Sequence, residues 1–170
     1  MFLPGDIDTE MPGLSLRKLA AEDAVPYFSA VDRNRAHLSQ FEDQTSSKYP
    51  TLESVQKSIK EYPYKRVTEF GDTKTSMGIW AQNSFVGSIN TTIGETGVEV
   101  GYWLDEAYTG MGYATCAVRA LTEFANRHYD VVYATVHEGN DASRAVLERS
   151  DYTFTRTFNI DGHSIDMYNA

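Results

Sequence analysis

The sequence predicts an α+β domain built on one mixed, mostly antiparallel and twisted sheet of about seven strands, flanked by about four helices. Two observations carry this prediction. Short alternating segments joined by tight turns in the middle of the chain indicate an antiparallel meander. A long helical pattern between two later apolar segments indicates a right-handed crossover between parallel strands. We therefore expect the sheet to be splayed or bridged where antiparallel pairing meets parallel pairing.

Length and composition bound the organisation of the chain. With 170 residues and a mass of 19.1 kDa, it can form one domain with a sizeable core. Residues 1–13 are acidic and contain Pro and Gly, so we predict an N-terminal extension there and a single domain over residues 14–170. The 41% hydrophobic and 12% aromatic content is typical of an ordered globular fold.

Charge and cysteine usage argue against several classes of partner. The net charge is −9, and without a Lys/Arg cluster we expect no nucleic-acid partner. An acidic surface favours a cationic partner such as an amine, but it also serves solubility. The single Cys116 fits a reducing compartment, and no segment has the length and apolarity to span a bilayer, so we expect a cytoplasmic protein without a membrane partner. The four histidines are scattered singly, so no metal site is predicted.

The first half of the chain is predicted to form one strand and two helices. Residues 14–17 alternate as a strand does, and apolar residues recur at helical spacing from residue 21 to about residue 36. Residues 37–47 are polar and are predicted to form a loop. Thr51 is then expected to cap a second helix that ends at Pro63.

The middle of the chain is predicted to form the antiparallel meander. Residues 76–81 and 84–93 read as strands joined by a hairpin turn at Gln82-Asn83. A second tight turn at residues 94–97 leads into another strand at residues 98–104.

The last third is predicted to alternate helices and strands. A helix extends from the glycine turn to about Tyr129 and is followed by a strand at residues 130–136. Residues 140–150 read as a capped helix. Residues 152–159 and 164–168 close the chain as a hairpin.

A glycine turn lies between the apolar strand and the long helix, within VEVGYWLDEAYTGMGYAT at residues 98–115. Backbone N–H groups and the positive end of a helix dipole make such a turn an anion site. A dinucleotide-binding motif is excluded, because Thr115 occupies the third glycine position and Asp130 precedes the next strand instead of ending it. The turn also lacks the Gly-Lys-Ser/Thr of a Walker loop, so it suits a pyrophosphate bound without a metal.

Two motifs carry a resemblance to a known family. EVGYWLDEAYTGMGYAT, followed by a helix, a strand and NDASRAVLERSDY, resembles the GNAT superfamily of acetyl-CoA-dependent N-acetyltransferases. The likeness is closest to its RimJ/RimL-type branch, which comprises ribosomal-protein N-terminal acetyltransferases and small-molecule-acetylating relatives. By element order it covers roughly residues 14–168. The resemblance implies a V-shaped splay between the central strands and acetyl-CoA as co-substrate, without a metal.

The resemblance also implies where the coenzyme binds. Tyr108 to Thr115 match the family's pyrophosphate loop, although Thr109 replaces the usual Gln or Arg and so removes one long polar group. The strand backbone before the loop would meet the pantetheine amides, and Asn140 would contact the pantetheine arm. The predicted coenzyme-binding residues are Tyr102, Trp103, Leu104, Thr109, Gly110, Met111, Gly112, Tyr113, Ala114, Thr115, Asn140 and Ser143.

Two residues are candidates for catalysis. Glu99 matches a family glutamate in a strand that is otherwise apolar, where it could take the proton of the attacking amine directly or through water. The alternative is a surface glutamate on a half-exposed strand. Ser143, in the Asn140-x-x-Ser143 motif, would lie near the sulfur and donate to the leaving thiolate, because Leu147 stands where many members have Tyr. The alternative is an ordinary first-turn serine after an Asn cap.

The acceptor and the activity leave alternatives open. By resemblance, Phe41, Glu42 and Asp43 would contact the acceptor amine, either a protein N-terminus or a small molecule. The leading prediction is an N-acetyltransferase that works by direct attack in a ternary complex. The alternative is a non-catalytic acyl-CoA-sensing module on the same fold. A purely structural domain would leave the joint occurrence of both motifs without a reason, and the oligomeric state, monomer or homodimer, stays open.

Overall fold

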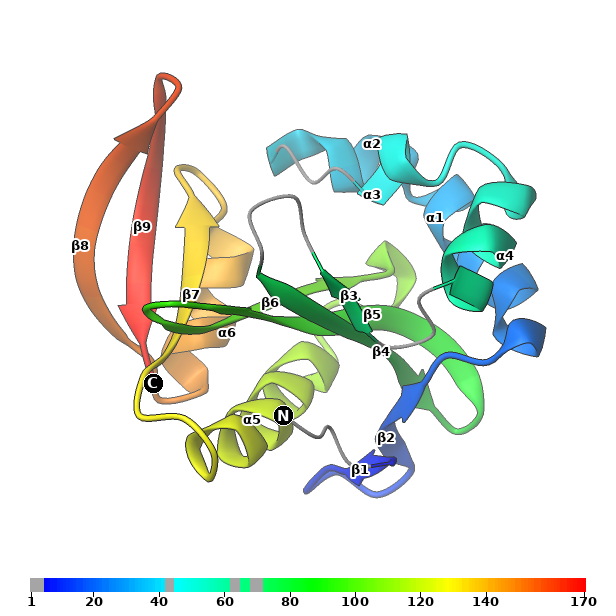
Figure 1. The fold of residues 1–170 in the computed structure, drawn as a ribbon, viewed down its shortest axis with the longest axis horizontal. Helices are drawn as coiled ribbons and strands as arrows, with labels where there is room; N and C mark the ends of the chain where they lie inside the picture. The colour runs from blue at the N-terminus through cyan, green and yellow to red at the C-terminus, as the bar shows by residue number, and fades with distance from the viewer. Residues whose placement is uncertain (1–4, 42–44, 62–64, 68–71) are drawn as a thin grey trace.

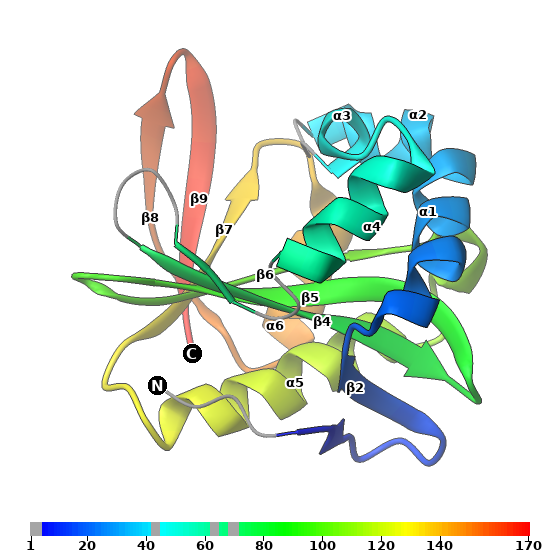
Figure 2. The ribbon, with the colours of Figure 1, turned by 45° about the vertical axis from the view of Figure 1, so that its right-hand side comes forward.

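The computed structural model describes residues 5–41, 45–61, 65–67 and 72–170, which form one nine-stranded mixed sheet with helices on both faces (Figures 1 and 2). The strands are β1 (Ile7–Asp8), β2 (Leu14–Lys18), β3 (Lys65–Val67), β4 (Thr73–Ala81), β5 (Ser84–Gly94), β6 (Gly97–Leu104), β7 (Val132–His137), β8 (Thr153–Ile160) and β9 (His163–Asn169). The α-helices are α1 (Ala24–Arg33), α2 (Arg35–Leu38), α3 (Thr45–Lys48), α4 (Leu52–Glu61), α5 (Tyr113–Asn126) and α6 (Asp141–Arg149). Single 3-10 turns are η1 (Ala21–Asp23), η2 (Ser39–Phe41) and η3 (Glu106–Tyr108).

The sheet confirms the predicted meander and crossover. Its strand order is β1-β2-β4-β5-β6-β7-β9-β8, with β3 beside β4. Among the described strands every neighbouring pair is antiparallel except β6 and β7, which α5 connects. These two strands pair only at Val98 with Val132 and at Glu99 with Tyr133. Beyond these pairs β6 and β7 part, which is the expected splay.

Two hydrophobic cores hold helices against opposite faces of the sheet. One core lies on the α5 and α6 side and contains Val100, Leu121 and Leu147. The other lies on the α1 and α4 side and contains Val31, Val55 and Trp103. Figure 2 shows α1 and α4 above the sheet and α5 below it. The period of two along β6 explains the division, because Val100 and Trp103 occupy positions of opposite parity.

The first predicted helix is interrupted in the structure. The helical spacing predicts one helix over residues 21–36, but α1 ends at Arg33 and α2 begins after Asn34. Only 2% of the Asn34 surface is exposed, and its side chain donates to the Ala30 carbonyl (2.7 Å) and accepts from the Glu106 N–H (2.9 Å). An Asn side chain that bonds the backbone competes with the helical ladder, so the helix breaks there.

The loop predicted at residues 37–47 is also wrong, because it holds the end of α2, η2 and the start of α3. The Arg35 guanidinium donates to the carbonyls of Ser46 (2.8 Å) and Tyr49 (3.1 Å) and so holds these short turns together. The predicted total of about seven strands and four helices missed β1, β3, α2 and α3, each too short to show a period. No helix in the described ranges is long and apolar enough to cross a membrane.

A buried acid connects α1 to the turn that precedes the glycine loop. Asp105 is 1% exposed, and its carboxylate accepts from the Arg33 guanidinium and from the Ala107 N–H (3.1 Å). Burial opposes ionisation of Asp105, but hydrogen bonds from Asn34 and Arg33 outweigh it and hold the pKa of this carboxyl below its usual value. The Asn34 side chain also accepts from the Glu106 N–H. One cluster of side chains therefore joins the end of α1, where the helix breaks, to the start of η3.

Replacing Gly97 should test a close backbone approach at positive φ in the sheet. Gly97 has a φ of +141°, and an added Cβ would lie 2.6 Å from the Val131 carbonyl oxygen. Gly97→Ala should therefore lower the free energy of unfolding by about 2 kcal/mol or more, measured by urea denaturation. The control is Gly162→Ala, also at positive φ (+87°) but with nothing within 4 Å of the added Cβ, for which a loss of about 1 kcal/mol is expected. Equal losses would contradict the steric argument.

The Asp105 cluster should be visible in the pH dependence of stability. A carboxyl whose pKa is lowered on folding adds stability above its unfolded pKa of about 3.9 and loses it as pH falls through the folded pKa. Asp105→Asn should cost about 1–3 kcal/mol at pH 7, and its stability should decline less than that of the wild type on acidification.

Asp32→Asn is the matched control, because Asp32 pairs with Arg35 at 2.9 Å but its side chain is 60% exposed. We expect a change of about 0.5 kcal/mol or less for this variant. Urea denaturation between pH 7 and pH 3 measures both variants, and indistinguishable acid limbs would refute the role of Asp105.

Candidate functional site

A cavity of about 670 Å³ lies where β6 and β7 part. One wall is the strand β6 from Val100 to Leu104, and the facing wall is β7 from Ala134 to His137. The glycine loop and α6, from its N-cap to its last residue, also line the cavity, as do α2 and η2. Five segments from three stretches of the chain, residues 37–41, 100–115 and 134–149, therefore meet around one space.

The glycine loop has the geometry of an anion cradle. Gly110 (φ +76°) and Gly112 (φ +81°) both adopt the left-handed conformation, and Gly112 is the N-cap of α5. The first intrahelical bond closes from the Cys116 N–H to the Gly112 carbonyl (3.1 Å). A helix leaves its first N–H groups without intrahelical partners, and the first-turn residues Tyr113 to Thr115 line the cavity. These donors and the dipole of α5 fit a pyrophosphate group.

Thr109 and Met111, two of the glycine-loop residues predicted to bind the coenzyme, differ from the others in their relation to the cavity. Thr109 lines the cavity, but its hydroxyl donates to the Glu106 carbonyl (2.8 Å) and so closes η3. Met111 is 52% exposed and is not among the described residues that line the cavity. The remaining predicted loop residues, Gly110, Gly112, Tyr113, Ala114 and Thr115, all line it.

The start of α6 brings Asn140 and Ser143 to the cavity. The Asn140 side chain accepts from the Ser143 N–H (3.1 Å), so Asn140 is the N-cap of α6. The Tyr102 hydroxyl, which comes from β6, lies 2.8 Å from the Ser143 hydroxyl and donates to the Ser143 carbonyl (3.1 Å). Burial outweighs the opposing hydrogen bond with Ser143 and raises the pKa of Tyr102 to about 12, so the phenol stays protonated at neutral pH. No sequence pattern pointed to this contact, because its partners are 41 residues apart.

Glu99 lies at the vertex of the V, set back from the cavity. It is not among the described lining residues, whereas Thr135 on β7 is. The Thr135 hydroxyl donates to the Glu99 carboxylate at 2.5 Å. Burial and then the nearby Glu99 charge raise the pKa of Tyr133, the residue opposite Glu99 in the parallel register. Glu99 is half-buried, and its carboxylate is bonded to the neighbouring strand β7 through Thr135.

The predicted acceptor end is partly described. Phe41 lines the cavity with His37 and Leu38, while Glu42 and Asp43 lie outside the described residues. Trp103, a predicted coenzyme residue, also lines the cavity, and its ring packs edge-on against Tyr27 with centroids 5.7 Å apart. Its side chain therefore belongs to the core under α1.

Two histidines were missed as site residues. His37 from α2 and His137 from the end of β7 both line the cavity, although no motif in the sequence singles them out. The His137 ring also lies 6.4 Å from the His163 ring. The described residues contain no group of three or more His, Cys, Asp or Glu that could hold a metal ion.

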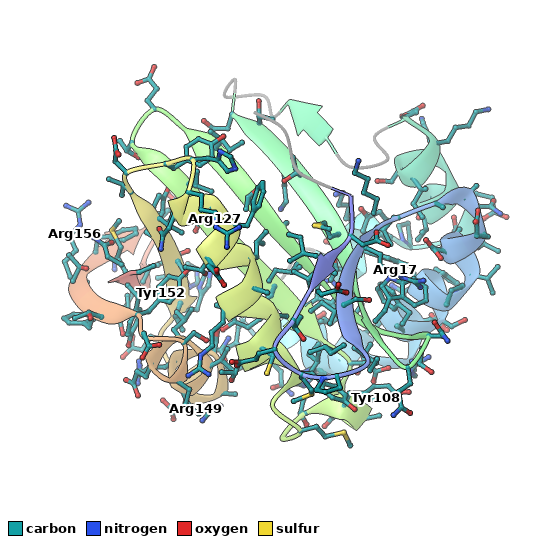
Figure 3. All side chains as sticks on the ribbon, turned by 90° about the horizontal axis from the view of Figure 1, so that it is seen from below. Arg17, Tyr108, Arg127, Arg149, Tyr152 and Arg156 are labelled. Atoms are coloured by element: carbon teal, nitrogen blue, oxygen red, sulfur yellow. The ribbon has the colours of Figure 1, made fainter. Side chains whose placement is uncertain are left out.

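Hydrogen bonds from the residues just after α6 attach this side of the cavity to α5. The Tyr152 hydroxyl lies 2.7 Å from the Thr122 hydroxyl of α5, and Ser150 donates to the Thr115 carbonyl at 3.4 Å. Figure 3 shows Tyr152 beside α5 and Arg149 at the end of α6. The residues that follow α6 are therefore bonded to α5 at Thr115, in its first turn beside the glycine loop, and at Thr122, two turns further along the helix.

Solved structures with the same fold include several acetyltransferases. RimL, a ribosomal L7/L12 α-N-protein acetyltransferase solved with coenzyme A, has a TM-score of 0.79 and 23% identity, with 97% of each chain covered. An acetyltransferase from Salmonella typhimurium that modifies the N-terminal serine of ribosomal protein L7/L12 has a TM-score of 0.74 and 26% identity, covering 97% of this chain and 98% of that one. RimJ of Mycobacterium smegmatis, solved with a CoA disulfide, has a TM-score of 0.76 and 21% identity, covering 98% and 88%.

The family assignment comes from the sequence match. No curated protein is significantly similar to the chain in sequence. Residues 14–153, however, match the acetyltransferase (GNAT) domain, and this range contains β6, the glycine loop, β7 and α6. The resemblance inferred from the two motifs is thereby confirmed, and the chain belongs to the GNAT acetyltransferase family.

Proposed function

We propose that this GNAT acetyltransferase transfers the acetyl group of acetyl-CoA to a primary amine by direct attack within a ternary complex. The observation that carries the proposal is the continuity of the cavity, which reaches from the glycine loop through the gap between β6 and β7 to His37 and Phe41. Two substrates that enter from opposite ends would meet in this gap. Holding them together supplies much of the rate of a direct transfer.

The coenzyme would occupy the end of the cavity formed by the glycine loop and α6. The N-terminus of α5 and the loop N–H groups would bind the pyrophosphate. Beyond Glu99, β6 has no pairing with β7. The Gly101 carbonyl accepts from the Asn90 side chain (2.9 Å), so the β6 backbone groups from Tyr102 to Leu104 that face the gap would meet the pantetheine arm and the thioester carbonyl. Asn140 and Ser143 would approach the arm from the other side. No metal has a role in this proposal.

The chemistry requires one proton to leave the amine and one to reach the thiolate. The neutral amine attacks the thioester carbon, the C–N bond forms and the C–S bond breaks. Glu99 would take up the proton that the nitrogen loses. The hydroxyl of Ser143, held by the protonated Tyr102, would donate a hydrogen bond to the departing sulfur. Coenzyme A and the acetylated amine are then released.

The acceptor we propose is a protein N-terminus or a small primary amine. Support for a protein N-terminus comes from the acetyltransferase of Salmonella typhimurium, whose described acceptor is the N-terminal serine of L7/L12. In this chain the acceptor would lie against His37, Leu38 and Phe41, with Glu42 and Asp43 nearby in sequence. The net charge of −9 would favour the approach of a cationic amine.

Coenzyme binding and turnover test the proposal directly. Calorimetry should detect 1:1 binding of coenzyme A, and a panel of amines and N-terminal peptides should include at least one that releases free CoA from acetyl-CoA. Binding without release on any amine would favour the acyl-CoA-sensing alternative instead. Failure to bind CoA at millimolar concentration would contradict both.

Thr109 offers a gain-of-affinity prediction. Its hydroxyl is engaged with the Glu106 carbonyl, and the position lacks the long polar side chain usual in the family. Thr109→Arg should place a guanidinium beside the pyrophosphate and tighten CoA binding by about threefold to tenfold. The control is Thr109→Val, which loses the hydroxyl without adding a cation and should not tighten binding. Calorimetry measures the dissociation constant for CoA in the wild type and in both variants. Unchanged affinity in Thr109→Arg would mean that the pyrophosphate lies elsewhere.

A further inference from the structure

We propose that the Thr135 hydroxyl relays the proton of the attacking amine to Glu99; this inference rests on the proposed acetyl transfer. The Glu99 side chain is not among the described residues that line the cavity, so an amine in the cavity would not meet it directly. Thr135 does line the cavity, and its hydroxyl donates to the Glu99 carboxylate at 2.5 Å. One side chain thus touches both the substrate space and the candidate base.

The strand register places these groups together. Glu99 pairs with Tyr133, and Thr135 is two residues further along β7, so Thr135 lies on the same face of the strand. It is also the first residue on that face beyond the point where the strands part. Across the gap, Gly101 lines the cavity and has no side chain to cover the hydroxyl. The vertex of the V is therefore open to the cavity at Thr135.

A threonine hydroxyl suits a relay because it donates one hydrogen bond and accepts others. The Thr135 proton is directed at Glu99, which leaves the lone pairs of its oxygen for an N–H group in the cavity. As the C–N bond forms and the C–S bond breaks, the nitrogen proton moves to the Thr135 oxygen while the Thr135 proton moves to the Glu99 carboxylate. Threonine stays neutral throughout. The thiolate takes up one proton from solvent, and Glu99 returns one to solvent, so the reaction balances.

The chain offers a rival route that makes the inference testable. His137 also lines the cavity and could accept the proton without Thr135. If the proton leaves through His137, the Thr135 hydroxyl contributes nothing to turnover. If it leaves through Thr135 and Glu99, removing either group interrupts the same path. Losses from two residues on one path do not multiply, whereas losses from independent contributions do.

The experiment compares Thr135→Val, Thr135→Ala, Thr135→Ser, Glu99→Gln and the double variant Thr135→Val/Glu99→Gln. The assay uses the amine that the wild type acetylates fastest in the CoA-release panel. We expect Thr135→Val and Thr135→Ala to lower kcat by about 100-fold, a typical contribution of positioned proton transfer, with an unchanged KM for acetyl-CoA. Thr135→Ser keeps the hydroxyl and should restore most of kcat. The double variant should be no slower than the slower single variant.

The matched control is Thr157→Val on the C-terminal hairpin. The Thr157 hydroxyl donates to Asp166 at 2.6 Å, which is the same kind of pair at an exposed position outside the cavity. This variant should keep the wild-type kcat. The dissociation constant for CoA, measured for each variant, confirms that the coenzyme site is folded.

The outcomes separate the relay from the proposed function. An active wild type with undiminished kcat in Thr135→Val overturns the relay alone, and so does a double variant whose loss is the product of the two single losses. A loss of kcat in Thr135→Ser as large as that in Thr135→Val also overturns it, because the hydroxyl is then not the group that matters. A wild type that acetylates no amine overturns the proposed function and the relay together.

Discussion

The parallel pairing of β6 and β7 ends after two residue pairs, and the site depends on that early end. A continuous parallel ladder would use the facing backbone groups of both strands for hydrogen bonds. Because the strands part at Glu99 and Tyr133, these groups border a cavity instead. The two parallel residue pairs directly precede the lining residues of β6 and β7 along each strand. The spaces proposed for coenzyme and acceptor, and the position of the candidate base, therefore depend on one irregularity in the sheet.

Contacts from both sides hold the strands apart. On the β7 side, α6 is fastened to α5 through the hydroxyl pair of Tyr152 and Thr122, and to β6 through Tyr102 and Ser143. On the β6 side, the buried Asp105 ties the end of the strand to Arg33 at the end of α1. These contacts fix the walls without filling the space between them. The result is a preformed cavity between two hydrophobic cores, which suits a reaction that must align two substrates.

The Asp105 cluster also links the two ends of the cavity. Asn34 interrupts the helix before α2, which carries His37 and Leu38 to the acceptor end. The same Asn34 side chain binds the Glu106 N–H, and η3 leads directly into the glycine loop. A buried, fully bonded polar cluster is costly to disturb, so it fixes the relative position of the elements that it joins. The elements proposed to meet the acceptor and the coenzyme are thus positioned by one group of side chains.

The predictions that succeeded were those with a local cause. Strands β4 to β6, the helices α5 and α6 and the C-terminal hairpin follow from alternation, helical spacing, caps and turns over neighbouring residues. The predictions that failed concern residues whose conformation is set from a distance. The break at Asn34 depends on Glu106, and the short turns after it depend on Arg35 reaching Ser46. Neither partner is visible in a window of the sequence.

The features of the candidate site also fall into those with a local cause and those set from a distance. The glycine turn and the Asn140 cap could be read from the chain because backbone conformation and capping are properties of a few consecutive residues. Three other features could not be read in this way: the hydrogen bond from Thr135 to Glu99, the contact of Tyr102 with Ser143, and the place of His37 and His137 in the same cavity. These contacts depend on strand register and on how far β6 and β7 diverge, and only packing of the complete sheet against its helices determines that divergence.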